Sequence, residues 1–369
     1  MEFTATKEAV LLAAQNVLRA VPVKPMQPEQ GSILLSAEEN GIILAGTDSE
    51  LGIKCWSTAQ IITEGEVLLP GRYFVNVLRR LPPGPFSVKK EPETEHIFIQ
   101  AGASNFKLLT IVGKFPPLEP EQKTVMATVP ELALRSGINK VAFAAARDGL
   151  RQLLNSVLLS VGENKIRLVA TDGHRLAITE ALEAGDDDTT DYLVPVRCLE
   201  EVSRIFSGEE QVEIVASGKQ IVFQATKARV ISRLVEGKYM PYESVIPTDF
   251  AWQAVVDRDE LLAALERAQV FCSENENNAV DIKLTATGVG IFARSAKIGH
   301  LEDLVDGEIK GSNLEISFNV NYLIEPLKVL EAEKILLEFS GVDSAALLSP
   351  FGSQSYRYLV MPITTRAVS

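Results

Sequence analysis

Residues 67–84 read VLLPGRYFVNVLRRLPPG, which predicts a short apolar strand, a proline and then an amphipathic helix. The same pattern returns twice, as YLVPVRCLEEVSRIFSGE at 192–209 and as ISFNVNYLIEPLKVLEAE at 316–333. Pro70, Pro195 and Asn319 hold equivalent places, 125 and 124 residues apart. A period of this length indicates a triplicated domain, because the repeats of solenoid proteins are much shorter.

The segments on either side of these helices repeat as well. A predicted helix opens each unit, as TKEAVLLAAQNVLRAV (6–21), VPELALRSGINKVAFAA (129–145) and DRDELLAALERAQVF (257–271). A predicted hairpin follows each second helix, as FSVKKEPETEHIFIQA (86–101), QVEIVASGKQIVFQA (211–225) and ILLEFSGVDSAALLS (335–349). We therefore expect an α+β fold of three domains, each with two helices packed on antiparallel sheets.

The domains are expected at residues 1–120, 126–247 and 252–369, with linkers near 119–125 and 247–253. Apolar stripes at helical spacing predict which helix faces are buried. These stripes are Phe74, Val77, Leu78 and Leu81; Leu199, Val202, Ile205 and Phe206; and Leu261, Leu262, Leu265 and Ala268. Pro326 lies inside the last repeated helix and is expected to distort its first turns.

Composition limits the class of protein. The chain has 369 residues, of which 46% are hydrophobic and 23% charged, as in ordinary globular proteins. No apolar run approaches the roughly 18 residues of a membrane span, and MEFTATKEAV lacks the pattern of a secretory signal. The three cysteines, Cys55, Cys198 and Cys272, are far apart, which favours buried free thiols in a reducing cytoplasm.

The net charge of -13 argues against nucleic acid, but the distribution of charge argues for it. Acidic residues gather in loops, whereas the polar faces of the repeated helices are basic. Those faces carry Arg79, Arg80, Arg197, Arg204 and Lys328, and the opening helices add Arg19, Arg135, Lys140, Arg258 and Arg267. One such face is ordinarily just solvated, yet the same bias on repeated helices suits contact with DNA phosphates. No base-reading motif accompanies it.

The stretch RLVATDGHRLAITE (167–180) resembles an active site, since Asp172 and His174 could relay a proton. However, no nucleophile motif accompanies them, and Asp-Gly between strands is a strong hairpin signal. The acidic loop GDDDTTD (185–191) lacks the spacing of a calcium loop, and LPGRYF and VEGKYM are not phosphate-binding loops. We expect no catalytic residue, no metal and no cofactor.

The C-terminal stretch SYRYLVMPITTRAVS (355–369) leaves two interpretations open. Its apolar run at Leu359–Ile363 can be a final strand docked in a core. It can also line a groove for a partner's peptide, because methionine and other apolar side chains suit adaptable recognition.

Together, the triplication, ATDGHRLA (170–177), FNVNYL (318–323) and YLVMPI (358–363) resemble the bacterial DNA polymerase sliding clamps, the β subunits of the replicative polymerase. The resemblance covers essentially the whole chain. It implies a head-to-tail homodimeric ring, with helices around a central hole and sheets outside. Duplex DNA would thread the hole without sequence readout, so the chain would be an accessory processivity subunit and no enzyme.

The resemblance also implies a pocket where the replicative polymerase α subunit, the clamp loader, other polymerases and repair proteins dock short peptides. Carried over by position, it comprises Leu154, Thr171, Gly173, His174, Arg175, Leu176, Val245, Asn319, Tyr322, Val360, Met361, Pro362 and Ile363. His174 and Arg175 are then walls and hydrogen-bond donors. Met240 and Ser244 depart from the family pattern, and six residues, 364–369, extend beyond Ile363.

DNA and dimer contacts follow from the same resemblance. Lys24, Arg72, Arg79, Arg80, Arg151 and Arg197 fall at or near DNA-facing positions, and the helix faces add Arg204 and Lys328. At the dimer seam, Phe106 and Leu108 of one subunit are expected to face Val270 and Phe271 of the other.

Two other functions remain to be separated from the clamp. One is an enzyme that uses Asp172 and His174, which a loss of turnover in His174→Ala would reveal. The other is a triplicated scaffold that binds proteins but never DNA, which charge reversal at Arg79, Arg80 and Arg197 would leave unaffected.

Overall fold

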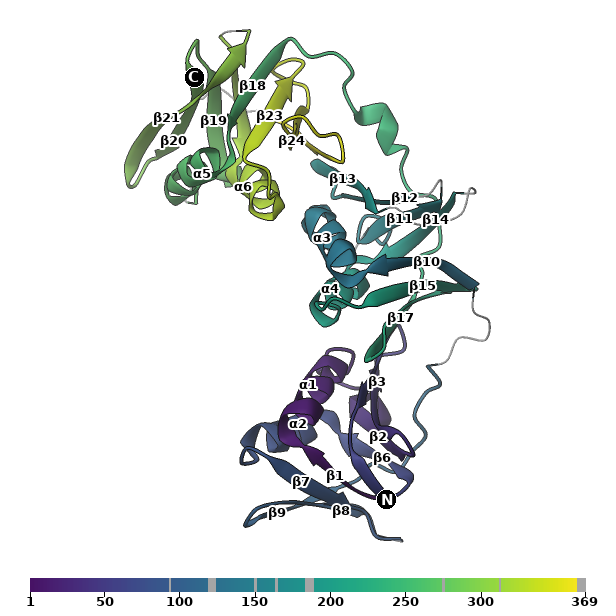
Figure 1. The fold of residues 1–369 in the computed structure, drawn as a ribbon. Coiled ribbons are helices and arrows are strands. Elements are labelled where there is room, and N and C mark those ends of the chain that lie inside the picture. Colours follow the sequence, from purple (N-terminus) through teal and green to yellow (C-terminus); the bar gives the residue numbers. More distant parts are fainter. Residues whose placement is uncertain are drawn as a thin grey trace. The chain divides into compact units, whose positions relative to one another are not determined.

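A computed structural model describes residues 1–92, 94–118, 124–148, 151–162, 165–182, 189–273, 276–311 and 313–363. The chain, drawn as a ribbon in Figure 1, divides into two compact units. Unit 1 comprises residues Met1–Arg135 and Arg197–Leu234, and unit 2 comprises Ser136–Val196 and Val235–Ser369.

Unit 1 holds two antiparallel sheets. The five-stranded sheet runs β5 (Gln60–Thr63), β1 (Glu2–Thr6), β7 (Pro85–Lys89), β8 (His96–Ala101) and β9 (Ser104–Leu109). The eight-stranded sheet runs β10 (Thr124–Pro130), β15 (Gln211–Ser217), β16 (Gln220–Gln224), β17 (Ala228–Arg233), β4 (Leu51–Ser57), β3 (Gly41–Thr47), β2 (Ser32–Glu38) and β6 (Gly65–Pro70).

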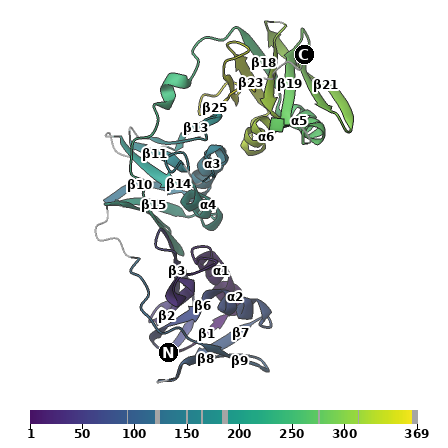
Figure 2. The same ribbon diagram turned by 180° about the vertical axis from the view of Figure 1, so that it is seen from behind.

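The helices of unit 1 are α1 (Lys7–Leu18), α2 (Gly71–Arg80), the short η1 (Pro28–Gly31) and, apart from its first residue, α4 (Val196–Ile205). Helix α1 contacts α2, β3 and β4 (Figure 2). Its buried residues Val10, Ala14 and Val17 recur at helical spacing, which explains the face that it turns to the sheet. Helix α3 (Glu131–Val141) begins in unit 1 and ends in unit 2.

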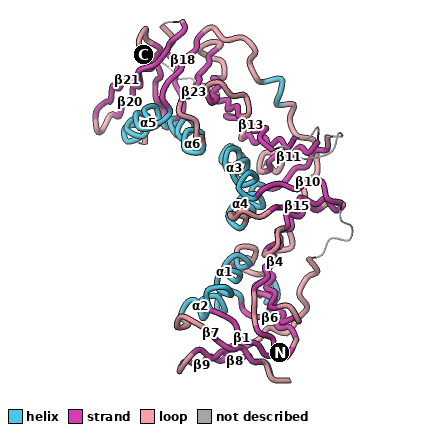
Figure 3. The backbone as a smooth tube through the Cα atoms, viewed as in Figure 1, coloured by secondary structure: helices cyan, strands magenta, loops and turns pink. Residues whose placement is uncertain are grey.

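Unit 2 holds one twelve-stranded sheet. Its strands run in the order β14 (Thr190–Pro195), β11 (Ser156–Gly162), β12 (Lys165–Thr171), β13 (Arg175–Leu182), β25 (Tyr356–Val360), β24 (Ala346–Pro350), β23 (Lys334–Phe339), β18 (Trp252–Asp257), β21 (Gly299–Lys310), β20 (Gly288–Ser295), β19 (Ala279–Leu284) and β22 (Glu315–Asn319). The helices are α5 (Arg258–Cys272), α6 (Val320–Val329), η2 (Ala142–Ala144), η3 (Tyr242–Val245) and η4 (Glu276–Asn278). Helices α5 and α6 lie side by side (Figures 1 and 3).

The sheets run across the expected domain boundaries. Strand β17 of the central repeat pairs with β4 of the first, and β13 of the central repeat pairs with β25 of the third. Backbone hydrogen bonds therefore tie each half of the central repeat to a different neighbour. This explains why the two compact units divide the central repeat.

The predicted apolar stripes are largely buried. In α2, Phe74 and Leu78 are fully buried, and Leu199 and Val202 of α4 and Leu265 of α5 are equally inaccessible. Helix α6 continues from Val320 to Val329 across Pro326, so the expected distortion does not interrupt it. Each hairpin predicted after a second helix is present, as β7–β8, β15–β16 and β23–β24.

The start of each repeat differs from the prediction. A strand precedes each opening helix: β1 before α1, β10 before α3 and β18 before α5. Their burial alternates, as at Phe3 and Ala5 or at Ala254 and Val256, so each strand turns one face to a core. The repeats were wrongly expected to begin with the helix.

Four other predicted segments differ from the prediction or lie partly or wholly outside the described residues. The linker expected at 247–253 ends earlier, because β18 begins at Trp252 and η3 lies before it. Residues 119–123 of the first linker, residues 185–188 of the acidic loop and the tail at 364–369 lie outside the described residues. In the described part of the chain, no helix is long and apolar enough to cross a membrane.

Candidate functional site

The turn between β12 and β13 is closed by the side chains of its first two residues. Thr171 Oγ1 donates to the carbonyl oxygen of Arg175 at 2.6 Å and accepts from the Gly173 N–H at 3.0 Å. Asp172 Oδ1 accepts from the N–H groups of His174 and Arg175, at 2.8 and 3.1 Å. Gly173 has a φ of 93°, which a residue without a Cβ adopts without strain. The Thr-Asp-Gly sequence therefore builds this turn.

Asp172 and His174 do not form a catalytic dyad. The second carboxylate oxygen of Asp172 accepts from Arg175 Nε at 3.0 Å, and its first oxygen is bonded to backbone N–H groups. Among the described residues, no hydrogen bond joins this carboxylate to the exposed His174 imidazole. A catalytic histidine needs such an orienting partner. The geometry therefore favours the hairpin that the sequence predicted.

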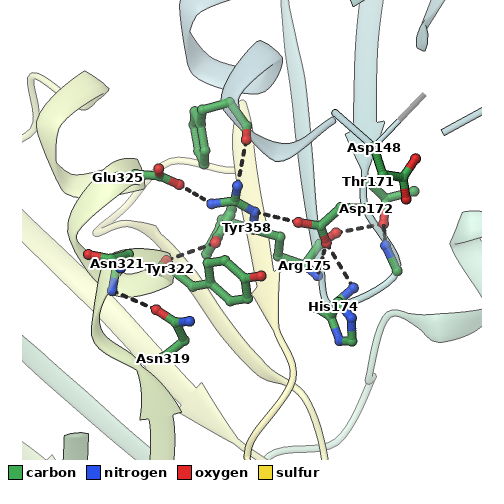
Figure 4. A network of polar contacts seen from close by, with 12 residues as sticks. Asp148, Thr171, Asp172, His174, Arg175, Asn319, Asn321, Tyr322, Glu325 and Tyr358 are labelled. Atoms are coloured by element: carbon green, nitrogen blue, oxygen red, sulfur yellow. Dashed lines mark hydrogen bonds and ion pairs between the residues drawn. The ribbon is translucent and has the colours of Figure 1, made fainter. Parts of the chain in front are cut away.

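Arg175 lies at the centre of a polar network that joins three elements (Figure 4). Its Nε bonds Asp172, one terminal nitrogen pairs with Glu325 of α6, and the other donates to the Phe143 carbonyl oxygen of η2 at 2.7 Å. Its guanidinium carbon lies 4.3 Å from the centre of the Tyr322 ring, and its side chain is 9% exposed. A planar fork of five donors can make these contacts, whereas a lysine ammonium cannot.

The charges in this network reinforce one another. Burial alone would lower the pKa of the Arg175 guanidinium, but Tyr358, Glu325 and Asp172 together raise it above its usual value. Burial, with Asp172 nearby, raises the pKa of the Tyr322 phenol, and burial likewise raises that of Tyr358. At neutral pH, Arg175 is therefore charged and both phenols keep the protons that they can donate.

Strand β25 brings the C-terminal residues against this turn through its pairing with β13. The pairing continues past the strand, where the Met361 N–H donates to the His174 carbonyl oxygen at 2.9 Å. Two residues on, the Ile363 N–H donates to the Ser317 carbonyl oxygen of β22 at 2.8 Å. Of the two interpretations of the run Leu359–Ile363, a docked strand holds for Leu359 and Val360, which are buried at the end of β25, while Met361 is 44% exposed.

All thirteen residues predicted for the pocket lie in unit 2, at different depths. Thr171, Leu176 and Val360 are buried; Leu154, Arg175, Asn319, Tyr322, Pro362 and Ile363 are half-buried; Gly173, His174, Val245 and Met361 are exposed. Asn319 caps α6, because its side chain accepts from the Asn321 N–H at 2.9 Å.

Two of the predicted pocket residues, Leu154 and Val245, are held by contacts other than hydrogen bonds to the turn. Val245 ends η3, whose Tyr242 packs with Leu176 in a buried apolar cluster. Leu154 accepts from the Ala146 N–H at 2.8 Å through its carbonyl oxygen. Within the described residues, no hydrogen bond ties Leu154 or Val245 to the Thr171–Arg175 turn.

Three residues that hold Arg175 were not predicted from the sequence, namely Phe143, Glu325 and Tyr358. A signal for two of them exists in the repeat. Glu325 lies 124 residues after Glu201, and Phe143 lies 124 residues after Arg19. Arg19 occupies the corresponding place at the other Thr-Asp turn, whereas Glu201 pairs with Arg19 and Arg204.

That other turn, between β3 and β4, is built in the same way. Asp48 Oδ1 accepts from two following N–H groups, and its Oδ2 pairs with Arg197 of α4. Arg197 also donates to the Arg19 carbonyl oxygen at 3.2 Å. Asp48 and Arg19 lie 124 residues before Asp172 and Phe143. Both turns therefore bind an arginine, which a helix supplies at the first and the hairpin itself at the second.

The eight cations predicted to face DNA fall into two groups. Lys24, Arg72, Arg79 and Arg80 are exposed and have no ion pair within the described residues. The other four are ion-paired: Arg151 with Asp148, Arg197 with Asp48, Arg204 with Glu201, and Lys328 with Glu266.

The residues predicted for the dimer seam lie in two elements, the edge strand β9 and the helix α5. Phe106 and Leu108 are half-buried in β9, an edge strand that pairs with β8 alone among the described strands. Val270, 61% exposed, and Phe271 lie in the last turn of α5.

No metal site is evident in the part of the chain that the structure describes, where no group of three or more His, Cys, Asp or Glu residues could hold an ion. The three cysteines are free and buried.

Comparison with known proteins identifies the family. Models of the N-terminal, central and C-terminal domains of the DNA polymerase III beta subunit match residues 1–119, 128–241 and 243–364. A beta sliding clamp of Synechococcus elongatus is 32% identical over 95% of this chain and 96% of its own.

Solved structures agree with this relationship. The DNA polymerase sliding clamp of Bacillus subtilis matches with a TM-score of 0.92 at 27% identity, over 99% of this chain and 100% of that one. A sliding clamp of Pseudomonas aeruginosa bound to griselimycin matches with a TM-score of 0.93 at 29% identity, with the same coverage. The chain belongs to the DNA polymerase III beta subunit family.

Proposed function

We propose that this DNA sliding clamp closes around duplex DNA as a head-to-tail homodimer and tethers partner proteins at the turn Thr171–Arg175. Family membership supports the clamp function and its role in processive replication. The arrangement of dimer, DNA contacts and peptide pocket is inferred from the residues described above. The chain is then an accessory subunit with no reaction of its own.

The main support for a peptide pocket at this turn is the hydrogen bond from the Met361 N–H to the His174 carbonyl oxygen. This hydrogen bond places Met361 next to His174, and both side chains are exposed. The contacts of Arg175 hold the backbone of the turn in place. A surface fixed before binding loses little entropy when a ligand docks. The exposed apolar side chain of Met361, next to His174, suits a short peptide with apolar anchors and a few hydrogen bonds, and the exposed Val245 is a further candidate anchor.

The role of Arg175 in this pocket differs from the one first expected. At least three of its five donors bond the chain's own oxygens, at Asp172, Glu325 and Phe143. We infer that Arg175 orients the turn and the Tyr322 ring, and that His174 meets the peptide.

The dimer is supported by two unpaired strand edges. Strand β9 has one, and the first part of β21 has the other, because β18 pairs with Gly307–Lys310 and leaves residues 299–306 bound to β20 alone among the described strands. Open edges recruit strands. Pairing β9 of one copy with residues 299–306 of another joins two different surfaces, which gives a head-to-tail arrangement. Lys107 on β9 complements Glu302 and Asp306.

Retention on DNA tests the clamp directly. The chain, loaded by its clamp loader with ATP, is passed over a gel-filtration column with nicked circular plasmid or with the same plasmid linearised. Retention on the circle that disappears on linearisation is expected of a ring held by topology. Equal retention on both would indicate ordinary electrostatic binding.

A scaffold that binds proteins without DNA is the second candidate, and the net charge of -13 favours it. Reversing Arg72, Arg79 and Arg80 to glutamate separates the two candidates, because these side chains have no ion pair within the described residues. If the chain is a clamp, this variant loses retention on the circular DNA. If it is a scaffold, the variant keeps its peptide binding, and neither it nor the unaltered chain is retained on the DNA.

A further inference from the structure

The division of the predicted DNA-facing cations into paired and unpaired groups has a functional meaning. We propose that Asp48, Asp148, Glu201 and Glu266 hold their cations off the DNA phosphates, so that α2 is the main phosphate-contact surface and the four carboxylates set the affinity for duplex DNA. This inference rests on the proposed clamp function.

Two of the pairs lie in unit 2. Arg151 donates to Asp148 Oδ2 with both Nε and a terminal nitrogen, at 3.1 and 2.9 Å. Lys328 of α6 lies 2.8 Å from Glu266 Oε1 of α5. About half of each cation's side chain is exposed, so solvent and ligands can reach it. A carboxylate at hydrogen-bond distance nevertheless occupies the place that a phosphate oxygen would take.

The other two pairs lie in unit 1. Arg204 bonds Glu201 at 2.7 Å, and the Glu201 side chain is only 9% exposed. Arg197 bonds Asp48 and the Arg19 carbonyl oxygen. Arg197 thus also anchors α4, whereas the Arg204 pair lies within that helix, where Glu201 also pairs with Arg19 at 3.5 Å. For this reason the two pairs in unit 2 give the cleaner experiment.

Helix α2 has the opposite character. Its sequence, GRYFVNVLRR, contains no acidic residue, and its exposed side chains are Arg72, Tyr73, Asn76, Arg79 and Arg80. Arg79 and Arg80 lie in the last turn, where the helix dipole stabilises a positive charge without a carboxylate partner. Helix α5, by contrast, exposes Asp259, Glu260 and Glu266.

Counterion release explains why the pairing matters. A cation that neutralises a phosphate releases a condensed counterion, and the slope of log Kobs against log salt steepens by about 0.9 for each such contact. A cation already bound to a carboxylate contributes little, because moving it to a phosphate leaves the carboxylate unpaired beside the DNA. The slope of log Kobs against log salt should therefore depend on the arginines of α2 and not on the ion-paired cations.

Binding of a short fluorescent duplex, followed by anisotropy over a series of salt concentrations, tests this. Glu266→Gln frees Lys328, and Asp148→Asn frees Arg151. Each is expected to bind more tightly and to steepen the slope by about 0.9. Glu315→Gln is the matched control, since it removes one negative charge from a pair with Lys283 (3.8 Å) that is not predicted to face DNA.

Two alanine variants complete the experiment. Arg79→Ala is expected to flatten the slope by about 0.9, while Lys328→Ala leaves it unchanged. In the Glu266→Gln background, however, Lys328→Ala should abolish the gain, which assigns that gain to the freed lysine.

The inference is overturned if Glu266→Gln and Asp148→Asn behave like Glu315→Gln, or if Lys328→Ala flattens the slope as much as Arg79→Ala does. Failure of the clamp function looks different, because the unaltered chain would then not be retained on nicked circular DNA. Retention of the unaltered chain, together with variants that match the control, rejects this inference alone.

Discussion

The hydroxyl of Tyr358 donates to the carbonyl oxygen of Tyr322 at 2.8 Å, where Pro326 leaves α6 without a donor. In a regular helix this carbonyl accepts from the N–H four residues later, but proline has none. Strand β25 supplies the missing hydrogen bond. The proline therefore couples the helix that carries Tyr322 to the strand that leads into Met361.

Removing the Tyr358 hydroxyl should reveal how much stability α6 loses because Pro326 has no N–H to donate. Tyr358→Phe leaves the half-buried Tyr322 carbonyl without this donor, so we expect the free energy of unfolding to fall by about 1–3 kcal/mol. Urea denaturation measures it. The control is the same change in a Pro326→Ala background, where the alanine N–H restores the helical donor. An equal loss in both backgrounds would contradict this role of the hydroxyl.

Arg175→Lys tests the network around the turn. Lysine keeps the charge but cannot bond Asp172, Glu325 and the Phe143 carbonyl oxygen at once. We expect a loss of about 2–4 kcal/mol in unfolding free energy, between the cost of one hydrogen bond and that of a broken buried ion pair.

The affinity for a clamp-binding peptide should fall in Arg175→Lys together with its stability, because the turn that holds His174 loses the contacts of Arg175. Arg151→Lys is the matched control, since its pair with Asp148 is exposed and contributes about 0–1 kcal/mol. A chain that tolerates both changes equally would show that the network does not support the turn.

The repeat and the helices could be read from the sequence because they depend on local patterns. Apolar side chains at helical spacing, such as Phe74 and Leu78, must face a core, and both are fully buried. The strand β1 was missed although its buried residues Phe3 and Ala5 alternate with more accessible positions, because five residues give little room for a pattern.

The partners of the charged residues could not be read in the same way. Arg197 and Asp48 are 149 residues apart, and Arg175 and Glu325 are 150 apart, so only the tertiary fold brings them together. A basic helix face in the sequence is the same whether its cations have no ion pair within the described residues, as at Arg79, or have one, as at Lys328.

The edge of β9 gives a prediction about assembly. Leu108→Lys places a charge on the strand edge expected to pair with residues 299–306 of another copy, and charges on edges block strand addition. Sedimentation should show a monomer at concentrations where the unaltered chain is a dimer. Val342→Lys, at an exposed apolar position outside this edge, should stay dimeric.

The buried thiols predict a loss of stability at high pH. Burial raises the pKa of Cys55 and Cys198 to about 12, whereas an unfolded thiol titrates near about 8.5. The unfolded chain therefore loses these protons first. Their contribution to the free energy of unfolding is complete below about pH 8.5 and is lost as the pH rises through about 12. Urea midpoints measured from pH 8 to 11 should fall, and less so in a Cys55→Ala, Cys198→Ala chain.

His174→Ala separates binding from both stability and catalysis. The imidazole is exposed, so the free energy of unfolding should change by no more than about 0.5 kcal/mol. Its position beside Met361 should weaken the binding of a clamp-binding peptide, measured by calorimetry, while retention on nicked circular DNA persists. His300→Ala, at another exposed histidine, should leave peptide binding unchanged. Unaltered peptide affinity in His174→Ala would show that His174 does not contact the peptide. Loss of an enzymatic turnover in this variant would instead support the enzyme hypothesis, which the hairpin geometry argues against.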